Sequence, residues 1–181
     1  SFTAGIGTSS MNLDLEDRAY DPTSGKPQTI SANYEDLYSP HFALNKIFNE
    51  KISVYASYSK GYKAPVSGNI IIGYTGQLNT SLVPEEGDQF EIGSKGNLLD
   101  SKLHYEVALF QAKFKNKFTS VAVPAGDGTT LYSYIANGGE LNNKGVEALF
   151  KYTAYESATG FFSNVSPYAN VAYSDFKYED F

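Results

Sequence analysis

Hydrophobic and polar residues alternate with a period of two along most of this chain, which is the pattern of β-strands rather than of helices. The alternation is clearest in residues 52–59, 103–109, 146–152 and 167–174. In the first of these segments the apolar positions are Ile52, Val54, Ala56 and Tyr58, and the intervening positions are three serines and a tyrosine. Each strand is therefore expected to have one apolar face and one polar face.

Weaker alternation elsewhere brings the expected number of strands to seven. They cover residues 2–15, 38–48, 52–62, 88–98, 103–118, 131–154 and 165–177. The connections at 49–51 and 99–102 are short and that at 155–164 is modest, whereas those at 16–37, 62–87 and 119–130 are long and rich in Gly, Pro, Asp and Ser. Long and short connections thus alternate, so all the long ones fall at one end of an up-and-down meander. Outer-membrane barrels show this asymmetry.

Aromatic residues reinforce the membrane interpretation. They make up 15% of the chain, with 15 Tyr and 12 Phe, and many stand at the ends of the expected strands, as in interfacial girdles. The mean hydropathy of -0.33 fits a barrel in which only alternate residues face lipid. Seven strands cannot close a single-chain bacterial barrel, because these have even numbers of strands. The chain is therefore expected to be part of a larger barrel.

Composition and charge exclude several other classes of protein. The chain has no Cys, hence no disulfide or thiolate site, and its net charge of -6 argues against nucleic acid as a partner. No run of apolar residues is long enough for a transmembrane helix. The two histidines, His41 and His104, lie on different expected strands without a carboxylate pair at ligand spacing. We therefore expect no catalytic residue, no metal site, no cofactor and no enzymatic activity.

Several motifs in the chain resemble the barrel of TonB-dependent outer-membrane receptors. A strand ends in Gly-aromatic-basic-Ala-Pro at residues 61–65, and a Pro-Glu pair at 84–85 precedes a Glu-x-Gly-x-Lys-Gly return strand at 91–96. The strand ending in Ala-Leu-Phe at 108–110 is followed by Asn137-Gly138 and by Lys-Gly-Val-Glu at 144–147. The family often has Arg where Lys63 stands. The resemblance runs from about residue 38 to residue 176.

The resemblance implies an all-β fold, an antiparallel up-and-down transmembrane β-barrel of roughly 22 strands in the whole protein. Residues 1–181 would form about seven of these strands within one partial barrel domain, and the N-terminal plug domain is absent from this chain. The implied location is the outer membrane of a Gram-negative bacterium. The implied activity is TonB-dependent uptake of a scarce, large nutrient, foremost a ferric siderophore, with the chain contributing to iron transport as barrel wall and loops.

The implied partners follow from the same resemblance. They are outer-membrane lipid and lipopolysaccharide, the protein's own plug domain, and the TonB complex acting through the missing N-terminal part. A surface lipoprotein or another membrane partner is also compatible with the family, whereas nucleic acid is not expected.

Two groups of residues are candidates for function. For ligand capture on the extracellular side, the aromatic and charged residues of the loop-side region are Tyr62, Lys63, Tyr74, Glu85, Glu86, Tyr132 and Tyr134. On the polar face directed into the lumen, the charged residues are Glu91, Lys95, Glu106 and Glu147, which can pair across strands or meet the plug.

Two other functions stay open at this point. A passive porin or a structural outer-membrane barrel would share the strand pattern and lack a plug. A soluble β-sandwich binding module would place the tyrosines in a core between two sheets. If the chain is part of a TonB-dependent receptor, the resemblance leaves iron chelates, haem, cobalamin and oligosaccharides all open as ligands.

Overall fold

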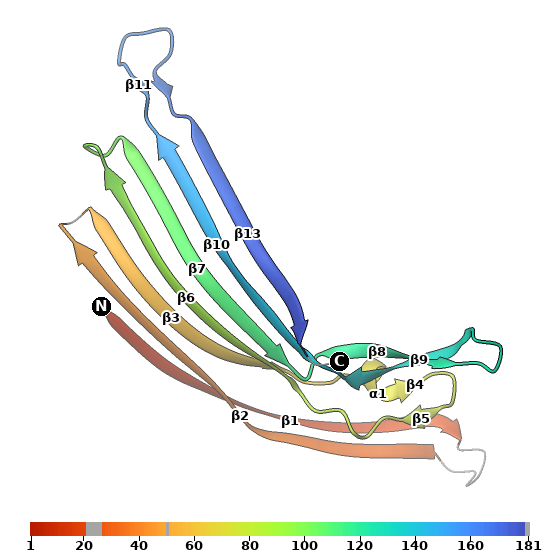
Figure 1. Ribbon diagram of the computed structural model, residues 1–181. Coiled ribbons are helices and arrows are strands. Elements are labelled where there is room, and N and C mark those ends of the chain that lie inside the picture. Colours follow the sequence, from red (N-terminus) through yellow and green to blue (C-terminus); the bar gives the residue numbers. More distant parts are fainter. Residues whose placement is uncertain (21–26, 50, 180–181) are drawn as a thin grey trace.

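Seven antiparallel strands form one curved sheet in the computed structural model, which describes residues 1–20, 27–49 and 51–179 (Figure 1). The strands are β1 (Phe2–Tyr20), β2 (Pro27–Phe48), β3 (Ile52–Lys63), β6 (Glu85–Leu98), β7 (Leu103–Lys115), β10 (Glu140–Tyr152) and β13 (Tyr168–Glu179). Each pairs with the sheet strands next to it along the chain, so the order is a simple meander. The expected number of sheet strands and their up-and-down topology are confirmed.

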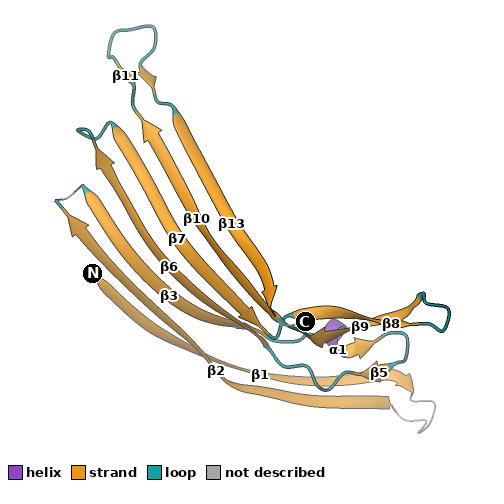
Figure 2. Cartoon of the chain, in the orientation of Figure 1, coloured by secondary structure: helices purple, strands orange, loops and turns teal. Residues whose placement is uncertain are grey.

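Short reversals join the strands at one end of the sheet (Figure 2). In the turn between β6 and β7, Leu99, Asp100 and Ser101 all adopt left-handed backbone conformations, with φ of 51°, 53° and 68°. The Lys102 amide donates to the Leu99 carbonyl at 3.1 Å and closes this turn. The connection from β10 to β13 is longer and holds a small hairpin of β11 (Tyr155–Glu156) and β12 (Asn164–Val165).

The connections at the other end carry structure of their own. Between β3 and β6 lie α1 (Ser67–Ile70), β4 (Ile71–Ile72) and β5 (Gln77–Leu78), and between β7 and β10 lies a hairpin of β8 (Phe118–Pro124) and β9 (Thr130–Asn137). Both project from the sheet alongside the extended β1–β2 hairpin (Figure 1). In the described part of the chain, no helix has the length and apolar character needed to cross a membrane.

The described parts of the segment 16–37, residues 16–20 and 27–37, which the sequence indicated as a loop, instead extend the first two strands. Within the described residues β1 continues to Tyr20 and β2 begins at Pro27. Leu13 and Leu15 alternate with acidic residues in β1, and Asp14 lies opposite Ser31 of β2, whose Oγ donates to its carboxylate at 2.7 Å. Cross-strand pairs of polar side chains therefore carry the hairpin well beyond the apolar part of the sheet.

The strand expected over 131–154 is two strands, β9 and β10, separated at Gly138 and Gly139. Gly139 has a φ of 66°, a left-handed conformation that glycine adopts without steric cost and that ends the pairing. The part before it, β9, pairs with β8 outside the main sheet, so the expected loop 119–130 is largely a strand. Asn116, with a φ of 54°, likewise ends β7 and turns the chain into β8.

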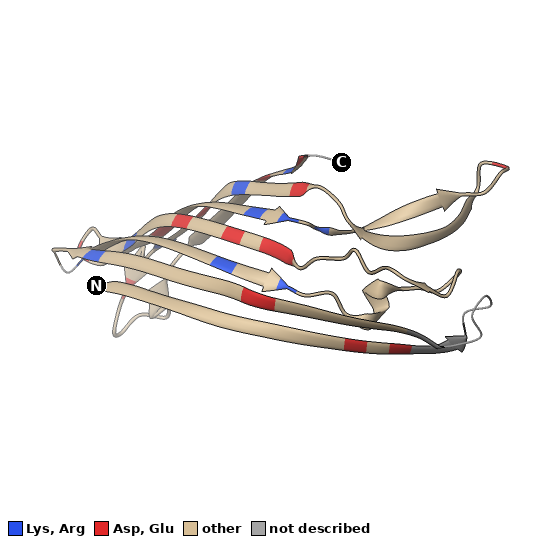
Figure 3. Ribbon diagram, turned by 90° about the horizontal axis from the view of Figure 1, so that it is seen from below, with Lys and Arg blue, Asp and Glu red and all other residues tan. Residues whose placement is uncertain are grey.

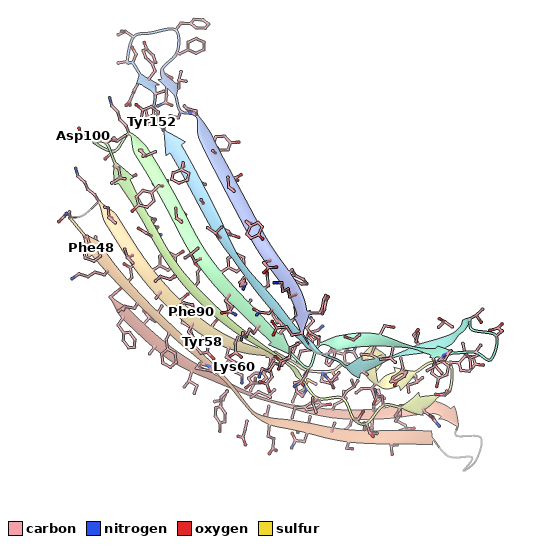
Figure 4. All side chains as sticks on the ribbon, viewed as in Figure 1. Phe48, Tyr58, Lys60, Phe90, Asp100 and Tyr152 are labelled. Carbon is pink, nitrogen blue, oxygen red and sulfur yellow. The ribbon has the colours of Figure 1, made fainter. Side chains whose placement is uncertain are left out.

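One face of the main sheet is apolar across six neighbouring strands. The register places Leu44, Ala56, Ile92, Leu109, Val146 and Tyr173 side by side in a single row. These side chains have no layer packed against them in the described structure, and Leu109 and Tyr173 are 54% and 64% exposed. Figure 4 shows the aromatic borders of this face, Phe48 and Tyr152 near the short turns and Tyr58 and Phe90 toward the loops. A continuous exposed apolar face of this extent requires an apolar surrounding such as lipid.

On the opposite face, aromatic rings lie over glycines of the adjacent strand. Tyr55 is paired with Gly93 and Phe110 with Gly145. A Cβ at Gly93 would lie 2.5 Å from the Tyr55 ring, and one at Gly145 would lie 2.1 Å from the Tyr173 carbonyl oxygen and 2.7 Å from Cζ of Phe110. Glycine is therefore required where ring and strand approach this closely.

Candidate functional site

The polar face of the sheet is hollowed at its centre. A hollow of about 490 Å³ is lined by side chains that include Tyr55, Glu91, Lys95, Glu106 and Glu147. Lys95 lies directly opposite Glu106, and the Tyr55 hydroxyl donates to the Glu91 carboxylate at 2.7 Å. The structure thus places the four charged residues selected from the sequence on one concave wall, where carboxylates predominate.

A second hollow, of about 400 Å³, lies on the same face at the loop-side ends of the strands and is named here the rim pocket. Its lining includes Lys63, Glu85, Gln89, Phe114 and Lys117. Gly61 and Gly87 face each other across β3 and β6 at its floor. Among the described residues, no atom lies within 4 Å of the position that a Cβ at Gly61 would occupy, so the floor is open.

Glu85 is the residue that the other polar groups of the rim pocket contact. It is only 7% exposed, and its carboxylate accepts a hydrogen bond from the Phe118 amide at 2.6 Å. The ammonium groups of Lys117 and Lys63 lie 3.4 and 3.5 Å from its two oxygens. Burial alone would raise the pKa of Glu85, but the Phe118 amide and the two lysines outweigh burial and hold the pKa below its ordinary value.

The two lysines also contact aromatic rings. Lys63 lies over the ring of Phe118, with its Nζ 5.2 Å from the centroid, and Lys117 lies over Phe114 at 5.6 Å. Two ammonium groups therefore share one carboxylate, which leaves this group of three with a net charge of +1. Such an arrangement favours an anionic or electron-rich group in the pocket.

Asn137 fastens the loops to the strand ends beside this pocket. Its amide nitrogen donates to the carbonyl oxygens of Val83 and Asn116 at 2.9 and 2.7 Å, and its amide oxygen accepts from the Val83 amide at 2.8 Å. A single side chain thus joins the start of β6, the end of β7 and the end of β9.

Further contacts make the loops one packed body. Asn79 donates to the Ile135 carbonyl at 2.6 Å, and the Tyr34 hydroxyl donates to the Leu82 carbonyl at 3.2 Å. The buried apolar side chains of this region are Pro65, Ile70, Leu82 and Leu141. Pro65, Ile70 and Leu82 belong to the β3–β6 loop and Leu141 to the start of β10. The loop contacts both neighbouring hairpins, with α1 and β4 against β9 and β5 against β2.

Two of the aromatic candidates meet across two loops. The rings of Tyr74 and Tyr132 are stacked, with centroids 4.9 Å apart and planes 8° from parallel. Tyr74 is 63% exposed, so the pair presents an open aromatic surface. Tyr134 follows on the same side of β9 two residues after Tyr132.

Tyr62 and Glu86 lie apart from this group. Both border the rim pocket, but strand alternation turns their side chains toward the apolar side of the sheet. There the Glu86 carboxylate lies 2.9 Å from Nζ of Lys60, which also lies 5.0 Å from the centroid of the Tyr62 ring. The structure therefore divides the seven candidates between the rim pocket, the stacked pair with Tyr134, and the outer face.

Sequence reasoning did not select Phe114, Lys117, Phe118 or Asn137 for a site. Lys117 and Phe118 stand at the end of the strand expected over 103–118, where nothing in the local pattern marks them as binding residues. Asn137 carried a usable signal, because an Asn-Gly-Gly run between two alternating segments marks a chain reversal in which the Asn side chain can bond to backbone groups.

Comparison with known proteins agrees with this geometry. The family model described as TonB dependent receptor-like, beta-barrel, matches residues 2–181. The ferripyoverdine receptor of Pseudomonas aeruginosa is 30% identical over 143 residues, which cover 78% of this chain and 17% of that protein. The chain therefore spans about a sixth of the length of this relative.

Solved structures share the fold at low sequence identity. The siderophore receptor PirA from Pseudomonas aeruginosa superposes with a TM-score of 0.66 at 15% identity, covering 99% of this chain and 44% of that one. The FrpB iron transporter from Neisseria meningitidis (F3-3 variant) superposes with a TM-score of 0.65 at 16% identity, covering 99% and 24%. The family is one of receptors and transporters rather than enzymes, and its barrels lie in the bacterial outer membrane. The chain belongs to the TonB-dependent receptor family, and its seven strands are barrel wall of that family.

Proposed function

We propose that this chain is the ligand-capturing wall of a receptor for TonB-dependent uptake of a ferric siderophore. The observation that carries the proposal is the packed loop-side body, which presents the rim pocket and the stacked Tyr74–Tyr132 pair together. The names of the ferripyoverdine receptor and of the siderophore receptor PirA support the class of ligand. In this proposal the plug domain and the TonB complex, both outside this chain, supply the energy-dependent step.

In this proposal the tyrosines and the lysines make different contacts with the ligand. The exposed tyrosine pair offers flat aromatic surface to an arriving chelate, since aromatic faces with a few polar groups are the usual lining of ligand sites. Lys63 and Lys117, each placed by Glu85, attract its anionic oxygens into the rim pocket. Because the loops are already packed, little conformational entropy is lost on binding.

The concave wall has a different task in this proposal. Glu91, Glu106 and Glu147 line the lumen near one lysine, Lys95, so the wall offers more negative than positive charge. A plug seated against it would present basic side chains there. We propose that these carboxylates hold the plug in register with the barrel rather than bind the transported ligand.

Removing both stacked rings tests the capture step. The variant Tyr74→Ala/Tyr132→Ala in the full-length receptor is expected to weaken binding of ferric pyoverdine about fivefold, because a stacked aromatic contact is worth roughly 1 kcal/mol beyond its buried area. Cells lacking other siderophore receptors would be assayed for binding and uptake of radioactive iron supplied as ferric pyoverdine. The matched control is Tyr155→Ala, an exposed tyrosine at the short-turn end.

Two outcomes would count against the proposal. Unchanged binding in the double variant would remove the tyrosine pair from the capture site. Uptake that persists undiminished in cells without TonB would favour the passive porin instead, since diffusion through an open barrel needs no energy from the inner membrane.

A further inference from the structure

Asn137 is the one asparagine in the sequence that is followed by glycine. An asparagine before glycine loses ammonia spontaneously in water, because glycine has no side chain to hinder attack by its backbone nitrogen on the asparagine Cγ. The attack closes a succinimide ring, and water then opens the ring to aspartate or isoaspartate. In this protein the asparagine most prone to that reaction is also the residue that fastens the loops to the strand ends.

The packed loops block ring closure at Asn137. Its amide nitrogen donates to the carbonyl oxygens of Val83 and Asn116, and its amide oxygen accepts from the Val83 amide. The attacking nitrogen is engaged as well, because the Gly138 amide donates to the Lys117 carbonyl oxygen at 2.8 Å. Both reacting groups must leave their partners before the nitrogen can reach Cγ. The reaction therefore requires local opening at the stem of the β8–β9 hairpin.

Deamidation would reverse the effect of this side chain on the loops. The product carries an oxygen where the amide nitrogen stood, so the carbonyl oxygens of Val83 and Asn116 lose their donor and face a carboxylate. Acceptors left without a donor and next to a negative charge destabilise the packed arrangement. Isoaspartate adds a further misfit, because it lengthens the backbone at the residue where the strand ends. The loops therefore do not repack in the same way after the reaction.

The new charge would also stand in an otherwise uncharged hairpin. Neither β8 nor β9, both of which the structure describes throughout, contains a charged residue, and Figure 3 shows the two strands in tan. Asn137 is paired with Phe118, whose amide donates to Glu85. A carboxylate at position 137 would thus add negative charge near Glu85 and its two lysines and offset their net positive charge.

We propose that Asn137 is a site of spontaneous deamidation that the loops protect while they are packed and expose when they open. The Gly138 nitrogen bonds to Cγ as ammonia leaves, and one water molecule then cleaves a C–N bond of the ring, so no enzyme or cofactor is needed. Because the reaction destroys the contacts that had prevented it, a receptor whose loops have opened for long enough keeps an altered rim. The site depends on the packing of the loops and not on the identity of the transported ligand.

Ageing of the full-length receptor in detergent tests the protection. Peptide mass spectrometry would follow deamidation at position 137 in folded receptor and in receptor unfolded by heat and kept in urea, at the same mildly alkaline pH and temperature. The folded protein is expected to react at least about tenfold more slowly, because reaction requires the loops to open. The control is Gly138→Ala, whose Cβ would lie 3.4 Å from Thr119 and would hinder ring closure. Unfolded, this variant is expected to react several-fold more slowly than the unfolded parent.

The variant Asn137→Asp tests the consequence for the loops. Assembled variant receptor, recognised by its heat-dependent mobility in gels, is expected to show faster hydrogen exchange than the parent at the Val83 and Gly138 amides. The matched control is Asn164→Asp at the short-turn end, which keeps the oxygen that accepts from Ser166 and is expected to leave exchange at those amides unchanged.

Equal deamidation rates in folded and unfolded parent would overturn the proposal, because the loops would then give no protection. Absence of reaction in the unfolded parent would overturn it as well. Unchanged exchange in the assembled Asn137→Asp variant would show that deamidation leaves the loops packed, which also contradicts it. If that variant does not assemble, the two rates of the parent protein decide the matter.

Discussion

Replacing Gly145 by alanine is expected to abolish assembly of the barrel wall. The new Cβ would lie 2.1 Å from the Tyr173 carbonyl oxygen, which belongs to the backbone of the neighbouring strand, and 2.7 Å from the Phe110 ring. A ring can rotate away, but a carbonyl within the ladder cannot move without breaking its hydrogen bonds. Overpacking costs about 1–3 kcal/mol where neighbours can yield, and here the fixed neighbour is backbone, so we expect the upper end or more.

The measurement is the fraction of full-length receptor that reaches the outer membrane in folded form, read from its heat-dependent mobility in gels. The control is Gly61→Ala, because a Cβ there would meet no atom of the described structure within 4 Å. It is expected to change the free energy of unfolding by less than about 0.5 kcal/mol. Normal assembly of the Gly145 variant would contradict this argument, because it would mean that the Tyr173 carbonyl oxygen leaves room for a Cβ at position 145.

The second large effect is expected from Glu85→Ala, which should release the β8–β9 hairpin from the sheet. The change leaves the Phe118 amide without its acceptor and brings Lys63 and Lys117 together without the carboxylate between them. Removing one partner of a fully buried charge pair costs about 3–5 kcal/mol. Because the side chains of Lys63 and Lys117 are 68% and 29% exposed, we expect a smaller loss here, of about 1–3 kcal/mol, chiefly from the unpaired Phe118 amide. Hydrogen exchange of the Phe118 amide measures the opening directly and should accelerate in the variant.

A matched control for this change is Glu156→Ala, an exposed glutamate of β11 near the short turns, where no acceleration at Phe118 is expected. Protection of the Phe118 amide that survives in the Glu85 variant would contradict the assigned role and leave Asn137 as the main fastening of the hairpin.

The same contact predicts a dependence on pH. Because the pKa of Glu85 is lowered in the folded protein, its stabilising effect is fully present above the ordinary glutamate pKa and is lost as the pH falls through the lowered value. Protection of the Phe118 amide, corrected for intrinsic exchange, should therefore hold from neutral pH into mild acid and decline only below the ordinary range. Glu85→Gln should abolish this acid-dependent step, since the amide does not titrate.

The regular part of this molecule is readable from its sequence because one physical rule governs it. A strand between lipid and a polar lumen must alternate, so Val54, Val107 and Val171 reveal both the strand and its outward face. The same rule indicated the concave placement of Glu91 and Glu147.

The packing of the long loops against one another could not be predicted from the alternation of residues. The loop strands β4 and β5 have two residues each, too few for a period to appear. The central contact of this packing joins Lys63, Glu85 and Lys117, which lie more than twenty residues apart in sequence. Glu85 looked like a surface acid available to a ligand, and only the fold shows that its oxygens are occupied by two lysines and an amide.

The tip of the β8–β9 hairpin closes on itself. The Ala125 amide donates to the Thr129 carbonyl at 2.6 Å, and Asp127 accepts from the amide and the hydroxyl of Thr129 at 3.0 and 2.7 Å. All of these bonds lie within five residues, whereas the stem is anchored by Glu85 and Asn137. The tip can therefore be exchanged, lengthened or fitted with an epitope without loosening the barrel rim. A lineage facing phages or antibodies can replace this short segment while the barrel strands beneath it stay intact.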